Sequence, residues 1–153
     1  MYQKILVPLD GSQRAETILQ HVEPLARGWG AAVVLLQVVE SSMIMGYEGM
    51  NITIQESDLV QLREQVENYV NGMAEELEQR GLEVTAKVIL GPVVEGIIET
   101  ANEEQADLVA MASHGRTGLS RVFYGSVASG VLNRIDRPLL LIRSTGLVSE
   151  PET

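Results

Sequence analysis

The sequence predicts a single α/β domain, in which four helices flank a five-stranded parallel sheet in a doubly wound arrangement. Short, continuous apolar runs recur along the chain, as expected for strands covered on both faces of a parallel sheet. Segments with helical spacing of apolar residues separate these runs. At 153 residues, the chain is long enough for one domain that buries roughly 68–70% of its unfolded surface.

The first part of the chain reads as a right-handed βαβ unit. A compact apolar strand covers residues 4–8, and Ser12 is a candidate cap for the helix that follows. Pro24 lies inside this helix, and because proline removes a backbone hydrogen bond we expect a kink or an early end near His21. A β-branched run over residues 31–39 predicts the second, fully buried strand.

The segment from Glu40 to Gln55 shows neither helical nor strand periodicity, but it is more apolar than a simple connecting linker. Its methionines either pack the segment onto its own domain, or the segment is a mobile flap over a ligand or a partner subunit. Its apolar residues are Met43, Ile44, Met45, Tyr47, Met50 and Ile52.

A long helix comes next, with Asp58 as its cap and Gly81 as its C-terminal signal. The acidic residues on its other face are interpreted as solvated surface. The apolar stripe consists of Leu59, Leu62, Val66, Tyr69, Val70, Met73 and Leu77.

The remaining elements continue the alternation. A strand over residues 83–90 precedes a short helix that starts at Gly91-Pro92, and a buried strand covers Leu108 to Ala112. The last helix presents Val127, Val131 and Leu132 on its apolar face, and Gly130 inside it is attributed to a close contact between helix and sheet. Residues 138–143 form the fifth strand.

The glycine-rich loop after the fourth strand is the main candidate for a binding site. Gly115 and Gly118 can adopt positive φ, and a helix begins at Gly125-Ser126. Backbone N–H groups and the helix dipole would then point at one spot, which favours an anion, most often a phosphate. The same glycines could also serve only to turn the chain, because a single glycine cluster is a weak motif.

Composition and charge exclude or disfavour several classes of binding partner and of functional site. The formal net charge is −10, from 21 acidic and 11 basic residues, so nucleic acid and anionic lipid are disfavoured. The absence of cysteine excludes disulfides, thiol nucleophiles and thiolate zinc sites. No apolar run approaches the ~20 residues of a membrane span. We therefore expect a cytoplasmic protein with no membrane insertion and no nucleic acid partner.

Several segments resemble the universal stress protein family. Ala112-Ser113-His114-Gly115, nine further residues and then Gly125-Ser126 are similar to the Gly-x-x-Gly-x9-Gly-Ser/Thr loop of its ATP-binding members. Ala112 stands where that pattern begins with glycine, which adds a methyl group beside the expected ribose site. The segment 7–12 and Gln37-Val38-Val39 are also similar to the family, and the likeness extends from Tyr2 to Arg143.

The resemblance implies a Rossmann-like fold, of the adenine nucleotide alpha hydrolase-like type, over residues 1–145. The remaining residues, 146–153, are expected to form a flexible tail, as chain ends commonly do. The implied ligand is ATP, or else AMP or ADP, with Mg2+ held through the nucleotide phosphates. The implied role is nucleotide-dependent regulation in the stress response. The sequence has neither a Gly-x4-Gly-Lys-Ser/Thr loop nor a Ser-His-Asp arrangement, so we expect no catalytic residue and at most slow ATP hydrolysis.

The resemblance also assigns residues to the two ends of the nucleotide. His114 adjoins the loop as a hydrogen-bonding neighbour rather than a base. The base and ribose would lie near Pro8, Asp10, Val38, Met111 and Ala112, and the phosphates near Gly115, Arg116, Gly125, Ser126 and Val127. Without the family, Asp10 would be interpreted as a turn residue hydrogen-bonded to its own backbone.

Two other functions are compatible with the sequence. One is an interaction module of the same fold, with an empty or AMP-filled site, whose segment from Met43 to Ile54 engages a partner protein. The other is a small nucleotide-processing enzyme that uses His114 as acid or base. Whatever the function, the last strand, Leu139 to Ile142, would be an apolar edge, and family members similarly dimerise through it, so we expect a homodimer.

Overall fold

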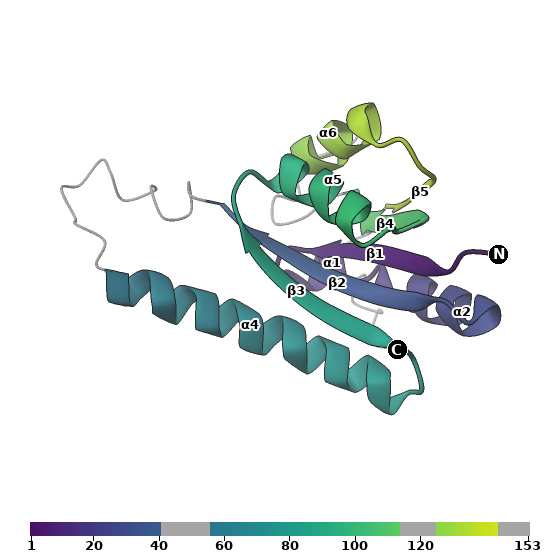
Figure 1. The fold of residues 1–153 in the computed structure, drawn as a ribbon, viewed down its shortest axis with the longest axis horizontal. Helices are drawn as coiled ribbons and strands as arrows, with labels where there is room; N and C mark the ends of the chain where they lie inside the picture. The colour runs from purple at the N-terminus through teal and green to yellow at the C-terminus, as the bar shows by residue number, and fades with distance from the viewer. Residues whose placement is uncertain (41–55, 114–124, 144–153) are drawn as a thin grey trace, which may run out of the picture.

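The computed structural model describes residues 1–40, 56–113 and 125–143. Five parallel strands form one sheet in the order β3-β2-β1-β4-β5 (Figure 1), which confirms the predicted fold class. The strands are β1 (Lys4–Leu9), β2 (Ala32–Val39), β3 (Val84–Leu90), β4 (Leu108–Ala112) and β5 (Leu139–Ile142). The helices are α1 (Gln13–Glu16), α2 (Leu19–Trp29), α4 (Glu56–Gln79), α5 (Val93–Glu103) and α6 (Ser126–Arg134).

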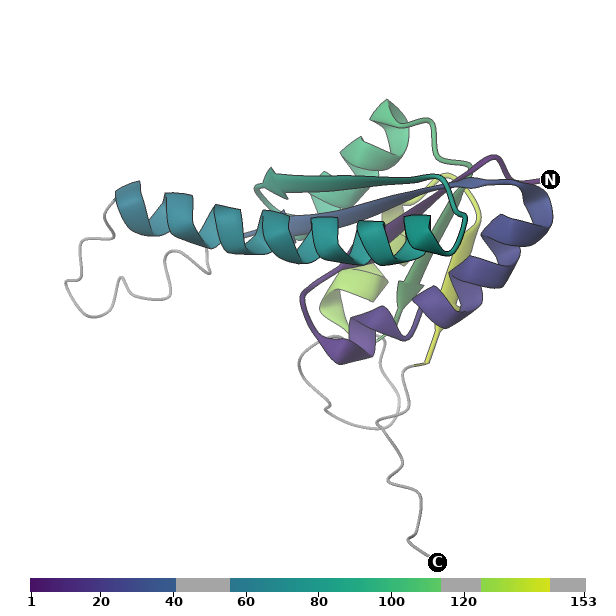
Figure 2. The same cartoon turned by 90° about the horizontal axis from the view of Figure 1, so that it is seen from below.

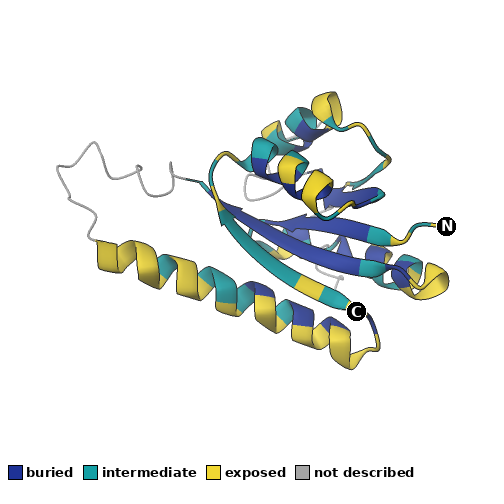
Figure 3. Ribbon diagram, viewed as in Figure 1, coloured by how far each residue is buried: buried dark blue, intermediate teal, exposed yellow. Residues whose placement is uncertain are grey.

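The sheet lies between two helical layers, each with its own apolar core. Helices α1, α2 and α4 pack on one face, while α5 and α6 pack on the other (Figure 1). Alternate residues of a strand point to opposite faces, so Leu35 joins the first core and Leu36 the second. The middle strands are almost entirely buried, whereas the edge strand β3 is only half-buried (Figure 3). This pattern explains the continuous apolar runs in the sequence.

The strand order reverses beside β1. From β1 the chain builds outward through β2 to β3, then returns to the other side of β1 and continues through β4 to β5. In the parallel register, Ile5 of β1 pairs with Val33 of β2 on one side and with Leu108 of β4 on the other. In open parallel sheets the crevice at such a reversal, outside the carboxyl ends of the strands, is where ligands bind.

The early helix end predicted near His21 is wrong. Helix α2 continues through Pro24 to Trp29, and the helical segment is instead interrupted between α1 and α2, at Thr17 and Ile18. Both Gln20 and Pro24 are exposed, so water can satisfy the Gln20 carbonyl that lacks an N–H partner. Proline therefore lies where its missing hydrogen bond costs least.

Two predicted core residues are instead exposed. The N-terminal half of α4 extends beyond the sheet in both views (Figures 1 and 2), and Leu59 is 37% exposed there. Leu132 of α6 is 47% exposed. Periodicity identifies the apolar side of a helix, but only the length of the sheet decides how much of that side is covered.

The close contact at Gly130 is with a helix and not with the sheet. A Cβ atom at Gly130 would lie 2.7 Å from Cγ2 of Val94, which belongs to α5. Gly130 therefore sets the close approach of α5 and α6, the two helices that cover the same face.

Three predicted regions lie wholly or mainly outside the described residues: the apolar segment 40–55, the loop 114–124 and the tail 146–153. Within the described ranges, none of the helices combines the length and apolarity needed to cross a lipid bilayer.

Candidate functional site

A pocket of about 320 Å³ lies where the strand order reverses. This volume is within the range of roughly 300–1,000 Å³ that is typical of small-molecule sites. Strands β1, β2 and β4 contribute their carboxyl ends to it, and α5 and α6 contribute their N-terminal turns. The lining residues are Pro8, Leu9, Asp10, Ala15, Gln37, Val38, Glu40, Val93, Ile97, Met111, Ala112, Ser113, Gly125, Ser126, Val127 and Ala128.

The pocket brings together the predicted site residues that fall within the described ranges. These residues come from separate strands and from the start of α6, so the fold is what unites them. They are Pro8, Asp10, Val38, Met111, Ala112, Gly125, Ser126 and Val127. The other predicted residues, His114, Gly115 and Arg116, lie outside the described residues.

Asp10 both shapes its turn and lines the pocket. Its Oδ1 accepts hydrogen bonds from the Ser12 amide at 2.9 Å and from the Ser12 hydroxyl at 2.5 Å. The same hydroxyl accepts from the Ala15 amide at 3.2 Å and so caps α1. Gly11 between them has a φ of +83°, a conformation that favours glycine. The turn thus holds the Asp10 carboxylate at the end of β1.

Ser113 connects the end of β4 to the start of α6 through a backbone hydrogen bond. Its backbone carbonyl accepts from the Gly125 amide at 2.7 Å, and its own amide donates to the Ile142 carbonyl at 2.7 Å. The residues on either side of the segment 114–124 are therefore held together at the pocket.

The first turn of α6 provides an anion-binding end. Gly125 is the N-cap, and it has no side chain with which to cap the helix. The first amide groups of a helix have no acceptor within the helix, and the helix dipole makes this end positive. No acidic residue lies in the first turn of α6. Ser126 and Val127 thus place helix N–H groups beside the pocket, where a phosphate would be stabilised.

The side of the pocket formed by β1 and β2 carries carboxylates. Asp10 follows β1 and Glu40 follows β2, while α6 begins beside β4. Carboxylates accept hydrogen bonds from hydroxyl and amino groups and repel phosphates. A ligand with an anionic end and an uncharged, donor-bearing end would therefore bind in one orientation, with its anionic end at α6.

Helix α5 forms a wall that sequence reasoning did not assign to the site. Val93 and Ile97 line the pocket, and Gly96 is the reason that α5 comes so close to β2. A Cβ atom at Gly96 would lie 2.8 Å from Cδ1 of Ile89 and 3.0 Å from Cγ2 of Val38.

Two buried polar side chains in the lining were also missed as site residues. Gln37 is 7% exposed and Ser113 is 5% exposed, and neither Gln37 Oε1 nor Ser113 Oγ has a hydrogen-bond partner in the described part of the chain. Buried polar groups are normally paired. A signal for Gln37 was present in the sequence, because it is the one polar residue in the run from Ala31 to Val39.

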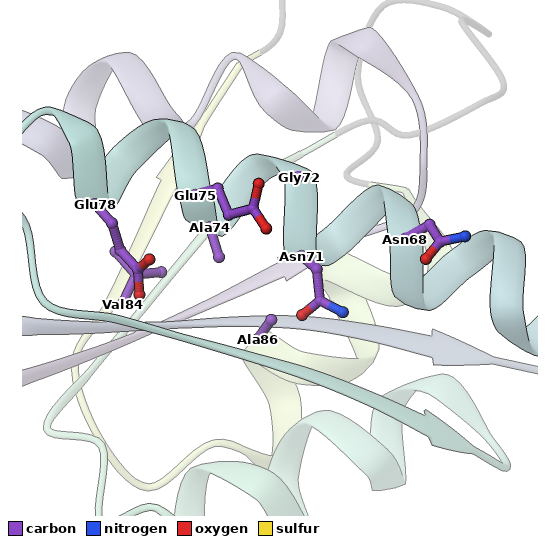
Figure 4. A pocket seen from close by; sticks show the side chains of 8 residues that line it. All are labelled: Asn68, Asn71, Gly72, Ala74, Glu75, Glu78, Val84 and Ala86. Carbon is purple, nitrogen blue, oxygen red and sulfur yellow. The ribbon is translucent and has the colours of Figure 1, made fainter.

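A second hollow, of about 440 Å³, lies between α4 and the edge strand β3 (Figure 4). Its polar side chains Asn68, Asn71, Glu75 and Glu78 come from α4 and are exposed. Exposed groups remain hydrated, so this hollow lacks the desolvated polar atoms of the first pocket. Across the described ranges, no cluster of three or more histidine, cysteine, aspartate or glutamate residues could hold a metal ion.

Comparison with known proteins identifies the family. The model of the universal stress protein family matches residues 1–143. The chain belongs to this family. The universal stress protein MJ0577 of Methanocaldococcus jannaschii is 31% identical to it over 155 aligned positions, which cover 94% of this chain and 96% of the relative.

Solved structures agree with the fold. A structure of MJ0577 has a TM-score of 0.82 at 32% identity and covers 95% of this chain and 99% of its own. A universal stress protein in complex with cAMP has a TM-score of 0.66 at 17% identity, covering 94% of this chain and 98% of its own. One from Archaeoglobus fulgidus in complex with dAMP has a TM-score of 0.64 at 19% identity, covering 93% and 98%. At these lower identities the likeness concerns the fold.

Proposed function

We propose that this universal stress protein binds an adenine nucleotide, ATP in particular, in the pocket beside β1 and acts as a nucleotide-dependent regulatory module. The observation that carries the proposal is the polarity of the pocket. Asp10 lies at the end of β1, while the uncapped N-terminus of α6 opens beside β4. A nucleotide has the matching polarity, with donor groups on its base and ribose and negative charge on its phosphates.

In the proposed complex, the base and ribose lie against Pro8, Asp10, Val38, Met111 and Ala112. The phosphates lie at Gly125, Ser126 and Val127, where helix N–H groups can donate to their oxygens. Gly115 and Arg116 belong to the phosphate side of the same proposal, and His114 adjoins them as a hydrogen-bonding neighbour. Mg2+ would be held through the nucleotide phosphates.

The family supports this class of ligand. The two universal stress proteins solved with cAMP and with dAMP each hold an adenine nucleotide. Their fold is shared by this chain, and the pocket lies where that fold binds ligands in general.

The geometry of Asp10 favours binding over turnover. Phosphoryl transfer needs a positioned base, and usually a bound metal. Oδ1 of Asp10 already accepts two hydrogen bonds from Ser12, which fixes the carboxylate as part of a turn. We therefore propose that the bound nucleotide itself is the signal, with at most slow hydrolysis.

The proposal includes one domain over residues 1–145 and a homodimer formed through β5. Strand β5 is an edge of the sheet, and Leu139–Ile142 is half-buried along its whole length. Leu132 of the adjacent helix α6 adds a further exposed apolar side chain. An apolar edge strand is a natural site for pairing with a second copy.

Calorimetric titration of nucleotide-stripped protein with Mg-ATP and with AMP tests the function. The parent should bind saturably, and Asp10→Asn should bind about tenfold more weakly because it loses the charged acceptor. Asparagine keeps Oδ1 for the bonds from Ser12, so the turn should survive. Asp136→Asn, at a side chain that is 73% exposed, is the matched control and should bind like the parent. A folded, nucleotide-free parent that binds neither ligand would contradict the proposal and favour the interaction module.

A further inference from the structure

Gln37 is the most unusual residue of the pocket. It lies near the end of the buried strand β2 and is 7% exposed, and its Oε1 has no hydrogen-bond partner among the residues described. The strand register places it beside Leu9, the residue before Asp10. Its amide nitrogen lies 3.6 Å from the point where a Cβ of Gly11 would be, so the amide group lies under the turn that presents Asp10.

This position calls for a donor that the described residues do not supply. A buried amide that loses its hydrogen bonds to water destabilises the folded state unless another group replaces them. Apolar side chains occupy the rest of the strand, so an apolar residue would fit the core better than Gln37 does. An acceptor that lines a pocket and lacks a partner is best explained by a ligand that donates to it.

Ser113 provides a second reference point in the same pocket. Its Oγ is also buried without a partner, and it lies at the end of β4, next to the first residues of α6. Strand β1 separates β4 from β2, so the backbones at Ser113 and Gln37 are about two strand spacings, or roughly 10 Å, apart across the sheet. A nucleoside can bridge such a span, whereas a single phosphate cannot. The ligand that contacts Ser113 near α6 therefore brings its base toward Gln37.

We propose that Gln37 selects a purine with an amino group at position 6 over one with an oxo group there. This inference rests on the proposed nucleotide function and deepens it. Oε1 of Gln37 accepts a hydrogen bond from the exocyclic amino group of adenine. In the amide orientation of the structure, with the nitrogen near Gly11, a 6-oxo purine places an acceptor against Oε1 of Gln37 and leaves both unpaired. Ser113 contacts the sugar and phosphate end and does not distinguish the bases.

The test compares ATP with inosine triphosphate, which differs from ATP at position 6 and in the proton on the adjoining ring nitrogen. Dissociation constants are measured for the full chain, for Gln37→Met and for Ser113→Ala. The parent should prefer ATP by about tenfold. Gln37→Met should bring the ratio close to one, mainly by weakening ATP. Ser113→Ala should weaken both nucleotides by the same factor and leave the ratio unchanged.

Two further variants guard against a folding artefact. Gln20→Met replaces an exposed glutamine on α2 and should behave like the parent with both nucleotides. Gln37→Leu, a second apolar replacement, should reproduce the ratio of Gln37→Met. Thermal unfolding of each variant shows that the comparison is made on folded protein.

The outcomes separate this inference from the proposed function. If the Gln37 variants keep the parent's preference for ATP over inosine triphosphate, Gln37 does not read the base. If they instead abolish a difference between ATP and 2′-deoxy-ATP, Gln37 reads the sugar, and the inference is equally overturned. A parent that binds no nucleotide overturns the proposed function itself.

Discussion

Gln37 is expected to destabilise the nucleotide-free protein, and we attribute its presence to the proposed binding role. Its buried amide oxygen has no partner within the described ranges, and such a group destabilises a folded protein by about 1–3 kcal/mol. We expect Gln37→Met to raise the free energy of unfolding of the nucleotide-free protein by about 1 kcal/mol, as measured by urea denaturation. A lower free energy of unfolding in the variant would show that the amide is satisfied in solution and not reserved for a ligand.

The glycine motif singled out Gly125 and Ser126 as candidate site residues, whereas Asp10 was assigned to the site only through the family resemblance. All three line the pocket. Gln37 and Val93 were missed because each lies within a pattern that already had an explanation, an apolar strand for one and a helix start for the other. Only the pairing of strands and the packing of α5 bring them to the same pocket.

The packing of α5 against α6 depends on Gly130. Alanine would favour the helix by about 1 kcal/mol, but its Cβ would lie 2.7 Å from Cγ2 and 3.3 Å from Cγ1 of Val94. Overpacking costs roughly 1–3 kcal/mol. We expect Gly130→Ala to lower the free energy of unfolding by about 1 kcal/mol, as measured by urea denaturation.

Val94→Ala provides the control for this prediction. It removes the two Cγ atoms that a Cβ at residue 130 would approach most closely and leaves only an ordinary contact with Cβ at 3.6 Å, so Gly130→Ala should be neutral or stabilising in that background. Stabilisation of the parent by Gly130→Ala alone would contradict the close packing of the two helices.

Tyr69 links α4 to the helix that follows the Asp10 turn. Its hydroxyl donates a hydrogen bond to the Glu16 carboxylate of α1. Burial, followed by this bond, raises the pKa of Tyr69 well above its usual range. The unfolded chain loses the tyrosine proton near pH 10. Because the pKa is higher in the folded protein, the folded state keeps this proton to a higher pH. The bond's contribution to stability should therefore be lost as the pH rises above about 10.

The variant Tyr69→Phe isolates this link. At pH 8 it should be less stable by about 1.5 kcal/mol, since a hydrogen bond to a charged acceptor is lost. Urea denaturation from pH 8 to 11 should show a smaller decline in stability for the variant than for the parent. Parallel pH profiles would show that Tyr69 ionises as freely in the folded protein as in the unfolded chain.

The sequence predicted where helices and strands begin and end more accurately than it predicted which of their residues are buried or how a helix continues through proline. The limits of β4 at Leu108–Ala112 and the start of α6 at Ser126 agree with the prediction. The uninterrupted course of α2 through Pro24 and the exposure of Leu59 do not. Local propensity decides where an element begins, whereas solvent access and the size of the sheet decide what a proline or an apolar side chain costs there.

At the scale of the whole molecule, the alternation of strands and helices predicts the α/β class, but the strand order comes from packing. Nothing in the apolar runs says that β4 pairs with β1 and not with β3. That pairing creates the reversal beside β1, and with it the pocket. The residue pattern places polar turns after three of the strands, and the family resemblance assigned them to one nucleotide site.

The proposed dimer can be tested at the same scale. Leu141→Lys places a charge on the half-buried edge strand β5 and should convert the parent dimer to a monomer in sedimentation velocity. Thr85→Lys, on the opposite edge strand β3, is the matched control and should remain dimeric. Circular dichroism should show that both variants are folded. An unchanged dimer in Leu141→Lys would exclude β5 as the interface.

The central claim is that adenine nucleotide binds at the end of β1. The most direct test is a titration of isotope-labelled, nucleotide-stripped protein with Mg-ATP, followed by amide chemical shifts. Saturable shifts should concentrate on the lining residues Asp10, Val38, Met111, Ala112, Ser126 and Val127, while amides of the hollow beside α4, such as Asn68 and Asn71, stay in place. Shifts confined to α4 and β3, or none at saturating ATP, would contradict the claim.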